Sequence, residues 1–206
     1  MGRGKFIVFE GSDRTGKTTQ SKLLFEKLKR KVPVKRMSFP NRETESGQMI
    51  DAYLKGIQNY SAECIHLLFS VNRWQCIKEM ECDLNNGITL IVDRYSYSGV
   101  AFSVSKGLQL EWCKMSEKGL PKPDVILYFR GDIDSIFLRD GFGSERYETL
   151  QIQRKVNDVY DKMMLDATDN NLWKLIDADG NIENISQEVE QIWNNLTTAG
   201  PITTLW

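Results

Sequence analysis

The feature that most constrains the fold is a glycine-rich loop between an apolar run and an amphipathic segment near the start of the chain. Residues 5–10 include the apolar run Phe-Ile-Val-Phe, and residues 11–18 have the spacing Gly-x-x-x-x-Gly-Lys-Thr. Gly11 and Gly16 let the backbone curl so that successive N–H groups point at a phosphate, and the helix expected next adds its positive end. A strand, this loop and a helix in succession are typical of a phosphate-binding P-loop rather than of a chance glycine turn.

The polar residues of this loop suit nucleotide triphosphate chemistry. Lys17 supplies a mobile point charge for the β- and γ-phosphates, and the Thr18 hydroxyl is a candidate Mg²⁺ ligand. Arg14 lies inside the loop, where its charge could stabilise a transferring phosphoryl group as an arginine finger does. Asp13 would then accept a hydrogen bond from a hydroxyl of a second substrate, or it would merely neutralise Arg14.

Composition and charge exclude several classes of protein. The chain has 206 residues, 41% of them hydrophobic, which suits one α/β domain spanning residues 1–206. Because 27 Lys and Arg balance 28 Asp and Glu, there is no global attraction to nucleic acid or to an acidic membrane. Phosphate recognition must therefore come from locally clustered basic residues.

Neither the cysteines nor the single histidine predicts a metal or disulfide framework. Cys64, Cys76, Cys82 and Cys113 form no C-x-x-C pair, which favours reduced thiols, and His66 cannot complete a His-rich site. No signal pattern and no apolar run of transmembrane length are present. We expect a soluble cytoplasmic protein without a membrane partner, with a nuclear location left open.

Apolar runs alternate with helical patterns, which indicates a doubly wound α/β fold. The expected strands are residues 5–10, 34–39, 88–92, 125–129 and 173–176, forming a five-stranded parallel sheet with helices on both faces. The expected helices are residues 16–30, 47–54, 62–84, 98–106, 110–118, 133–139, 150–167 and 185–196. The polar, glycine-containing residues from about 139 to 148 are typical of a short lid.

Charged residues follow two of these strands. Ligands of open α/β sheets bind beyond the carboxyl ends of the strands, so the P-loop, Arg42 and the Asp93-Arg94 pair should converge. Asp93 is placed to support Mg²⁺, although a helix cap is the alternative. Arg42 and Arg94 could grip a phosphate in two-point contacts, although either alone could be a solvated surface charge.

One predicted helix combines an aromatic ring with a guanidinium on the same face. Phe69 and Arg73 are four residues apart, so the ring could stack on a base while the guanidinium donates to a base carbonyl. The alternative is a core phenylalanine with an outward-reaching arginine. His66 is expected to be packed rather than catalytic.

Four stretches together resemble one enzyme family over essentially the whole chain. They are Gly-Ser-Asp-Arg-Thr-Gly-Lys-Thr-Thr-Gln at 11–20, Phe-Pro-Asn-Arg at 39–42, Leu-Leu-Phe-Ser-Val-Asn-Arg-Trp at 67–74 and Asp-Arg-Tyr-Ser-Tyr-Ser-Gly-Val-Ala at 93–101. The sequence is similar to thymidylate kinases of the eukaryotic or poxviral type. The resemblance implies a P-loop kinase fold and transfer of the γ-phosphoryl group of MgATP to dTMP, giving dTDP and ADP in dTTP biosynthesis. It further implies a cis Phe39-Pro40 bond and a homodimer formed through the helix near 62–84, although a plain core helix is the alternative reading of that segment.

The resemblance also assigns site residues by position, with Arg14, Lys17 and Arg94 as catalytic residues and Thr18 and Asp93 at the metal. The residues that it implies for ATP are Gly11, Ser12, Asp13, Arg14, Thr15, Gly16, Lys17, Thr18, Thr19 and Arg139, the last packing on adenine. The residues that it implies for dTMP are Asp13, Phe39, Arg42, Phe69, Arg73, Arg94, Ser98, Gly99, Phe102, Tyr147 and Gln153. Within this set, Asp13 accepts from the 3′-hydroxyl, Tyr147 crowds the 2′ position and Gln153 lies near Asp13. The stretch at 150–152 lacks the usual phenylalanine, which makes the register of Gln153 less secure than the rest.

Three other functions compete with this interpretation. A deoxynucleoside kinase would need a carboxylate base and would leave Arg42 without an anion. A GTP-binding switch is disfavoured because no Asn-Lys-x-Asp guanine reader is present and the Asp-Ala-Asp-Gly stretch at 177–180 comes too late in the chain. An inactive nucleotide-binding scaffold is disfavoured because each expected catalytic residue is present.

Overall fold

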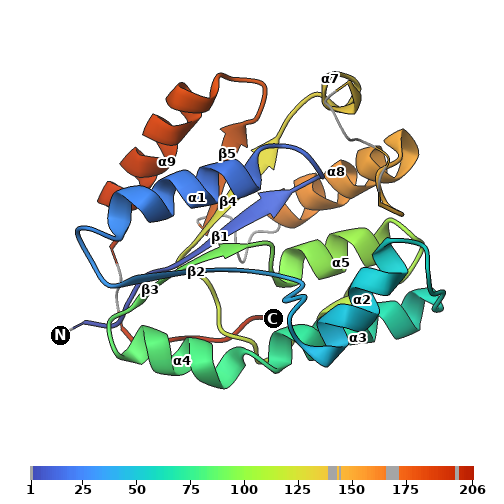
Figure 1. Ribbon diagram of the computed structural model, residues 1–206, viewed down its shortest axis with the longest axis horizontal. Helices are drawn as coiled ribbons and strands as arrows, with labels where there is room; N and C mark the ends of the chain where they lie inside the picture. Colours follow the sequence, from blue (N-terminus) through green and yellow to red (C-terminus); the bar gives the residue numbers. More distant parts are fainter. Residues whose placement is uncertain (1, 139–142, 144, 166–171, 198–199) are drawn as a thin grey trace.

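Five strands form one parallel sheet in the computed structural model, which describes residues 2–138, 143, 145–165, 172–197 and 200–206. The strands are β1 (Phe6–Gly11), β2 (Val34–Ser38), β3 (Thr89–Asp93), β4 (Val125–Arg130) and β5 (Trp173–Asp177), in the sheet order β2-β3-β1-β4-β5. Every neighbouring pair is parallel (Figure 1). The predicted sheet is therefore confirmed, with each strand within one residue of its expected ends.

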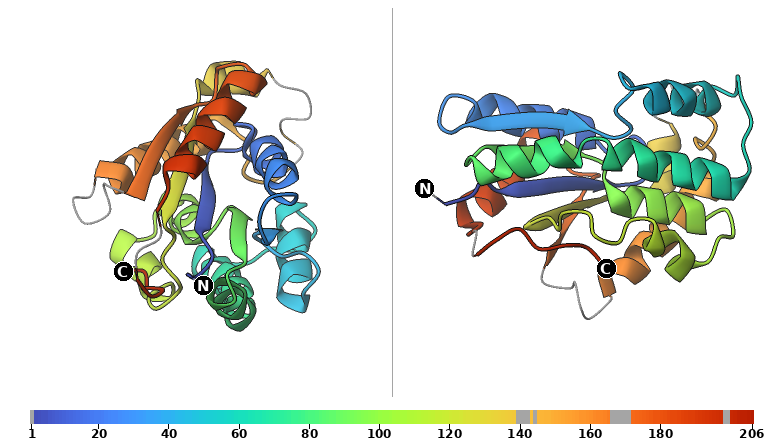
Figure 2. Two further views of the ribbon diagram at one scale, coloured as in Figure 1. Left: turned by 90° about the vertical axis from the view of Figure 1, so that its left-hand side faces the viewer. Right: turned by 90° about the horizontal axis from the view of Figure 1, so that it is seen from below.

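Helices cover both faces of this sheet. Within the described residues they are α1 (Lys17–Leu28), α2 (Glu45–Leu54), α3 (Ala62–Trp74), α4 (Ile77–Asn85), α5 (Ser96–Val104), α6 (Leu110–Met115), α7 (Ile133–Phe137), α8 (Leu150–Leu165) and α9 (Ile182–Asn195). Helices α1 and α9 pack on one face, and α4, α5 and α8 on the other (Figures 1 and 2). None of the helices described is long and apolar enough to cross a membrane.

The central strand β1 contributes side chains to both layers of the core, because successive side chains of a strand point to opposite faces of the sheet. Phe6 and Val8 belong to the apolar cluster under α4, α5 and α8, whereas Ile7 and Phe9 belong to the cluster under α1 and α9. All four side chains are buried, as expected for a parallel sheet covered on both sides. Burial on both faces makes this sheet a rigid support for the loops at its edge.

The single helix expected over residues 62–84 is wrong, because the chain breaks between α3 and α4. The Cys76 amide donates to the Arg73 carbonyl at 2.9 Å instead of to the carbonyl of Asn72, as an α-helix would require. The Asn72 carbonyl instead lies 3.7 Å from the Cys76 thiol. The regular hydrogen-bond ladder is therefore interrupted at Cys76, and apolar periodicity does not reveal this interruption.

The carboxyl ends of the strands lie at one edge of the sheet and carry the loops of interest. β1 leads into residues 11–16, β2 into the Phe39-Pro40 bond and β3 into residues 94–95. The Phe39-Pro40 bond is cis, as the family resemblance implied. Helices α2 and α3 stand beyond this edge, next to α5 (Figure 1).

The described end of the predicted lid, at residues 145–148, is attached to α2. The Arg146 amide donates to the Leu54 carbonyl and the Arg146 Nε to the Tyr53 carbonyl, both at 2.9 Å. The Arg146 guanidinium also lies 4.3 Å from the centre of the Tyr53 ring. Residues 139–142 and 144, including Arg139 with its expected adenine contact, lie outside the described residues.

Candidate active site

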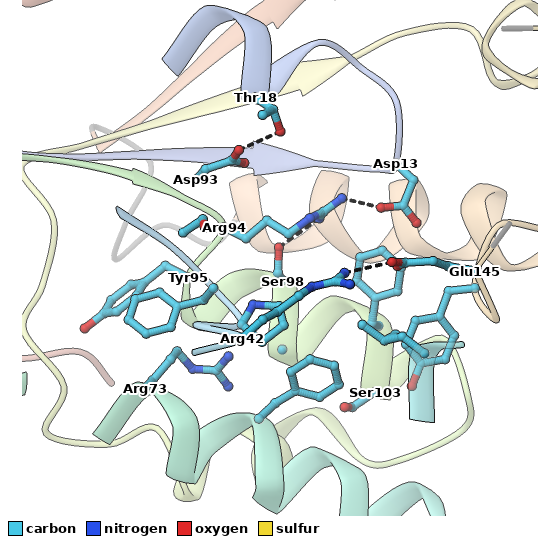
Figure 3. Close-up of a pocket in the computed structure, with 18 of the residues that line it drawn as sticks. Asp13, Thr18, Arg42, Arg73, Asp93, Arg94, Tyr95, Ser98, Ser103 and Glu145 are labelled. Atoms are coloured by element: carbon cyan, nitrogen blue, oxygen red, sulfur yellow. Dashed lines mark hydrogen bonds and ion pairs between the residues drawn. The ribbon is translucent and has the colours of Figure 1, made fainter. Parts of the chain in front are cut away.

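Two cavities open at the carboxyl edge of the sheet and share three residues: Asp13, Thr18 and Arg94. The cavity over the P-loop, here called the P-loop cavity, is also lined by Arg14, Thr15, Gly16, Lys17, Thr19, Gln20, Glu148, Ala178, Gly180, Ile182 and Ile185. The second, here called the acceptor cavity, lies between α3, α5 and the ends of β2 and β3 (Figure 3). Two cavities that meet at a P-loop are arranged for group transfer between two bound molecules.

Glycine is required at the start of the P-loop. Gly11 has φ 137°, and a Cβ there would lie 2.3 Å from the Phe129 carbonyl oxygen. Gly16 has φ 88° in the residue before α1, so the loop enters the helix through the left-handed region. The non-glycine Arg14 also has a positive φ, of 59°, in the middle of the loop. Such uncommon backbone conformations cluster at ligand-binding loops.

Lys17 is enclosed by the loop that it follows. Its Nζ donates to the Ser12 carbonyl and, at 3.0 Å, to Thr15 Oγ1. Burial and, to a lesser extent, the nearby Arg94 lower the pKa of Lys17 to about 7, against the opposing effect of the carboxylates around it. Negatively charged phosphates bound beside Lys17 would favour its charged ammonium form.

Arg14 is paired with a carboxylate from the far side of the P-loop cavity. Its Nε lies 2.9 Å from Glu148 Oε1. The other oxygen of Glu148 accepts from the amides of Gly143 and Glu145, at 2.9 and 3.2 Å. Glu148 therefore links the P-loop to the described part of the predicted lid, a connection that no local sequence signal indicated.

Asp13 and Arg94 form an ion pair where the two cavities meet (Figure 3). Arg94 Nη1 also donates to the Gly11 carbonyl at 2.9 Å. Gln153 forms two hydrogen bonds with Asp13. Its Oε1 accepts from the Asp13 amide at 2.7 Å, and its Nε2 donates to Asp13 Oδ2 at 2.6 Å. The structure therefore places Gln153 behind Asp13 and outside the lining of both cavities.

A fully buried carboxylate supports the turn that carries Arg94. Glu10 accepts from the amides of Tyr95 and Ser98, at 2.9 and 3.1 Å, and from the hydroxyls of Ser98 and Tyr160, at 2.5 and 2.7 Å. These four donors satisfy the buried carboxylate oxygens by hydrogen bonds. Arg94 has φ 66°, an uncommon value for a residue with a side chain, and the fixed amides that follow it hold this turn. Sequence reasoning missed Glu10, although a charged residue that ends an apolar strand is a usable signal.

Thr18 and Asp93 offer oxygen atoms side by side. The Thr18 hydroxyl donates to Asp93 Oδ2 at 2.6 Å, and Arg36 Nη2 lies 3.4 Å from the same oxygen. A hydroxyl and a carboxylate beside a phosphate-binding loop are ligands that Mg²⁺ prefers, so this pair fits a metal that also binds phosphate. No cluster of three or more His, Cys, Asp or Glu side chains suited to a metal occurs within the described ranges, so phosphate oxygens and water would complete the coordination.

Arg42 lies at the rim of the acceptor cavity and is half exposed. Its guanidinium forms ion pairs with Asp51 of α2 and, at 2.7 Å, with Glu145 (Figure 3). The carboxylates of Glu145 and Asp51 outweigh partial burial and raise the pKa of Arg42. Together with Arg94, it places two guanidinium groups around one cavity.

The other end of the acceptor cavity combines an aromatic ring with a buried guanidinium. Phe69 and Arg73 both line it, as their spacing on one helix predicted. Arg73 is 2% exposed and is paired through Nε and Nη2 with the fully buried Glu117. A Cβ at Gly99 would lie 2.5 Å from Arg73 Nη2, so only glycine leaves room for this guanidinium. Glu117 was not predicted as part of the site.

Aromatic and basic side chains close the side of the cavity next to α2. The Tyr147 hydroxyl accepts from Lys106 Nζ at 3.0 Å and donates to the Tyr53 hydroxyl at 3.2 Å. Its ring packs on Phe102 with centroids 5.4 Å apart, and burial raises the pKa of Tyr147. The Phe102 ring also lies 5.4 Å from the Arg94 guanidinium. Sequence reasoning found Phe102 and Tyr147 but missed Lys106.

Most of the residues expected around one substrate lie around the acceptor cavity. Its lining includes Asp13, Phe39, Arg42, Phe69, Arg73, Arg94, Ser98, Gly99, Phe102 and Tyr147. Of those expected around ATP, Gly11 and Ser12 line neither cavity, and their carbonyls instead accept from Arg94 and Lys17. The Asp-Ala-Asp-Gly stretch, considered as a switch motif, contributes Ala178 and Gly180 to the P-loop cavity.

Comparisons with known proteins agree with this arrangement. The Thymidylate kinase family model matches residues 9–189. The putative thymidylate kinase 251L of Invertebrate iridescent virus 6 is 51% identical over 191 residues, covering 92% of this chain and 88% of that protein. The thymidylate kinase of Homo sapiens is 38% identical over 209 residues, covering 99% and 98%.

The fold itself is also similar to that of a solved relative. The structure of thymidylate kinase from Candida albicans superposes with a TM-score of 0.89 at 33% identity, covering 99% of each chain. The family model, the relatives and the fold agree over nearly the whole length of the sequence. The chain therefore belongs to the thymidylate kinase family.

Proposed function

We propose that ATP occupies the P-loop cavity and dTMP the acceptor cavity, with the transferred phosphoryl group passing beside Asp13 and Arg94. As a thymidylate kinase, the chain catalyses ATP-dependent phosphorylation of dTMP to dTDP. The observation that carries the proposed placement is that the two cavities share Asp13, Thr18 and Arg94. Residues 1–206 act in it as one catalytic domain.

In this arrangement the protein works by positioning and by cancelling charge. The acceptor phosphate of dTMP has a second pKa of about 6 and is largely dianionic at neutral pH, so no general base is required. Arg94 and Arg42 hold that phosphate, and Lys17 and Arg14 face the phosphates of ATP. Basic groups on both sides offset the repulsion between two anions, which is the main obstacle to their approach.

At the other end of the acceptor cavity, Phe69 stacks on the thymine ring and Arg73 donates to its O4 oxygen. Asp13 accepts from the 3′-hydroxyl, held in place by Gln153, and Tyr147 closes the 2′ side of the sugar. Phe39, Ser98, Gly99 and Phe102 form the walls. In the P-loop cavity the backbone of residues 13–16, with Thr15 and Thr19, surrounds the phosphates. The adenine is proposed to contact Arg139.

Thr18 and Asp93 are the residues proposed to hold Mg²⁺ together with the phosphates of ATP. When bound, the ion would neutralise charge on the β- and γ-phosphates. Asp93→Asn should raise the Mg²⁺ concentration needed for half-maximal activity about tenfold, because one charged ligand is lost. An unchanged Mg²⁺ requirement would remove Asp93 from the metal site.

The placement of dTMP is tested by asking what Arg42 recognises. If Arg42 grips the monophosphate, Arg42→Ala should weaken dTMP binding in calorimetry by roughly tenfold to a hundredfold and leave thymidine binding almost unchanged. Lys55→Ala is the matched control, because Lys55 also pairs with Asp51 but does not line the cavity. Equal losses for dTMP and thymidine would contradict the proposed orientation.

A homodimer through the exposed side of α3 is the proposed assembly. Leu67, Val71 and Trp74 recur at helical spacing and are 45%, 47% and 42% exposed. Such a stripe on an amphipathic helix suits a second copy of the chain. Val71→Asp should convert a sedimenting dimer into a monomer, whereas a monomeric parent protein would reject the proposal.

We also propose a cytoplasmic location.

A further inference from the structure

Arg36 of β2 is a charged residue that the proposed function does not use. Like Ser38 two positions later, it lines the acceptor cavity, because side chains two apart on a strand point to the same face of the sheet. Ser38 is paired in register with Asp93 of β3. The Arg36 side chain is 21% exposed. It therefore places a further guanidinium at the end of the acceptor cavity where Asp93 lies.

One side of this guanidinium is fixed to helix α1. Arg36 Nε donates to Ser21 Oγ at 3.0 Å. The Ser21 hydroxyl gives its own hydrogen to the Thr18 carbonyl at 3.1 Å, so its oxygen is left to accept from Arg36. Ser21 is fully buried. The guanidinium is thus anchored beside the turn of α1 that carries Thr18, one of the two proposed metal ligands.

The other side of the guanidinium is loosely paired. Arg36 Nη2 lies 3.4 Å from Asp93 Oδ2, and the same oxygen accepts from the Thr18 hydroxyl at 2.6 Å (Figure 3). Hydrogen bonds between a guanidinium and a carboxylate are usually about 2.7 to 2.9 Å long. Among the residues that the structure describes, Arg36 Nη1 has no hydrogen-bond partner. The outer nitrogens of Arg36 can therefore change partners while Nε keeps its contact with Ser21.

The other arginines around the acceptor cavity are held more closely by carboxylates. Arg42 Nη2 lies 2.7 Å from Glu145, and Arg73 Nε lies 2.8 Å from Glu117. Of the arginines that line this cavity in the described part of the chain, Arg36 has the longest contact with its nearest carboxylate. Its charge is therefore the one most readily transferred to an anion bound in the cavity.

In the proposed function two cations compete for Asp93. One is Arg36, and the other is the Mg²⁺ proposed to bind Asp93 and Thr18 together with ATP. A carboxylate that binds a divalent ion has less charge to offer a nearby guanidinium, and the two cations repel each other. We infer that Arg36 couples the two substrate sites: it pairs with Asp93 when no metal is bound, and with the phosphate of dTMP once Asp93 binds Mg²⁺. The inference rests on the proposed placement of dTMP and of the metal.

The phosphate of dTMP is the anion that Arg36 is placed to bind. Arg36 lines the acceptor cavity, where Arg42 and Arg94 are proposed to hold this phosphate, and it does not line the P-loop cavity. The two outer nitrogens of a guanidinium suit two phosphate oxygens, and Arg36 can offer both once Nη2 leaves Asp93. Because coupling between two binding sites is reciprocal, MgATP and dTMP should strengthen each other's binding by the same factor.

This coupling can be measured by calorimetry with a non-hydrolysable ATP analogue at saturating concentration. We expect the analogue with Mg²⁺ to strengthen dTMP binding to the parent protein roughly tenfold, and the analogue with EDTA to have almost no effect. In Arg36→Met the factor with Mg²⁺ should fall to nearly one. Thymidine, which carries no phosphate, should show almost no coupling in either protein. No coupling in the parent, an undiminished factor in Arg36→Met, or equal coupling for thymidine would overturn the inference.

Lys35→Met is the matched control for this experiment. Lys35 is the neighbouring residue of β2 and has the same charge, but it pairs with Glu79 and Asp83 of α4 and lines neither cavity. The coupling factor of this variant should equal that of the parent protein. A fall as large as in Arg36→Met would mean that net charge, and not the position of Arg36, determines the coupling, which would contradict the inference.

A second variant tests the pairing from the side of Asp93. Asp93→Asn removes the charge that holds Arg36, so dTMP binding in EDTA should strengthen about threefold. Loss of a negative charge near the phosphate could have this effect by itself, so the same change is also made in Arg36→Met. There the gain should largely disappear, and an equal gain in both backgrounds would show that Arg36 is not the group released. If Arg36→Met does not fold, Arg36→Gln, which can keep the hydrogen bond to Ser21 without the charge, takes its place in both comparisons.

These assays separate the inference from the placements on which it rests. If Arg42→Ala loses dTMP and thymidine affinity equally, the placement of dTMP fails. If Asp93→Asn leaves the Mg²⁺ requirement unchanged, the placement of the metal fails. If both placements hold and the coupling factor survives in Arg36→Met, only the role of Arg36 is wrong.

Discussion

Arg14 Nε lies 2.9 Å from Glu148 Oε1, although the two residues are 134 positions apart in the chain. One belongs to the P-loop and the other to the end of the predicted lid. Because Glu148 also accepts from two backbone amides, its carboxylate is fixed where it can hold Arg14 in a single orientation. This pairing makes the orientation of the proposed catalytic arginine depend on residues 143 and 145–148.

Removal of Arg14 should slow phosphoryl transfer without unfolding the protein. Arg14→Ala is expected to lower kcat about a hundredfold, because one preorganised positive charge facing the transferred group is lost. The midpoint of thermal unfolding should change little, since the side chain is partly exposed. Near-normal turnover in this variant would remove Arg14 from catalysis.

If Glu148 acts by orienting Arg14, the two residues should behave as one unit in a double-mutant cycle. Glu148→Ala alone should lower kcat about tenfold. In the Arg14→Ala background the same change should have almost no further effect on kcat, because there is no guanidinium left to orient. Steady-state kinetics of the four proteins measure this coupling, and additive losses would mean that Glu148 acts independently of Arg14.

Truncation of Glu10 should destabilise the fold through the turn that carries Arg94. Glu10→Ala leaves two buried amides and two hydroxyls without their acceptor, which should cost about 3 kcal/mol in the free energy of unfolding. Tyr160→Phe removes only one of these donors and should cost about 1 kcal/mol. Urea unfolding monitored by circular dichroism gives both values. Equal stability of all three proteins would contradict this role for Glu10.

The sheet was predictable because apolar runs and the P-loop each have a strong local signal. The side chains of Phe6 to Phe9 alternate between the two core layers, so a run of four apolar residues is predicted to be a strand buried on both faces. The expected helix over residues 62–84 was wrong for the opposite reason. The break is a local change of hydrogen-bond partner at Cys76, whose amide donates to the Arg73 carbonyl, and helical periodicity continues across that point.

The site was predictable only where a residue type carries its own chemistry. Lys17, Arg94 and Arg73 were predicted because they follow a motif or share a helix face with an aromatic ring, and the structure places all three in the lining of the cavities. Glu117 and Glu148 were missed because their roles arise from contacts 44 and 134 residues away. A carboxylate that positions an arginine has no pattern of its own in the sequence, since either partner alone could be a surface charge.

The packing of Arg73 on Gly99 predicts a selective loss of acceptor binding. Gly99→Ala places a Cβ 2.5 Å from Arg73 Nη2, and the ion pair with the buried Glu117 prevents the guanidinium from moving away freely. We expect the KM for dTMP to rise at least about tenfold while the KM for ATP changes less than about twofold. Val104→Ala, on the same helix but outside the lining, is the control. Parallel changes in both KM values would indicate a general loss of structure instead.

The lowered pKa of Lys17 predicts that ATP binding takes up a proton. With a pKa of about 7, most Lys17 side chains are neutral at pH 8 in the free protein. Bound phosphates raise that pKa, so binding at pH 8 should take up close to one proton, and the affinity for ATP should fall as the pH rises above 7. Calorimetry with MgATP in buffers of different ionisation enthalpy measures the uptake directly.

Two variants identify the group that is protonated. Lys17→Met should abolish the uptake, whereas Lys106→Met should not, although burial lowers the pKa of Lys106 to about 8. Lys106 lines the acceptor cavity and not the P-loop cavity, so the charge of ATP should affect it far less. If binding took up no proton, or took one up through Lys106, Lys17 would already be charged in the free protein. The conclusion that burial by the P-loop keeps it neutral until phosphates arrive would then be wrong.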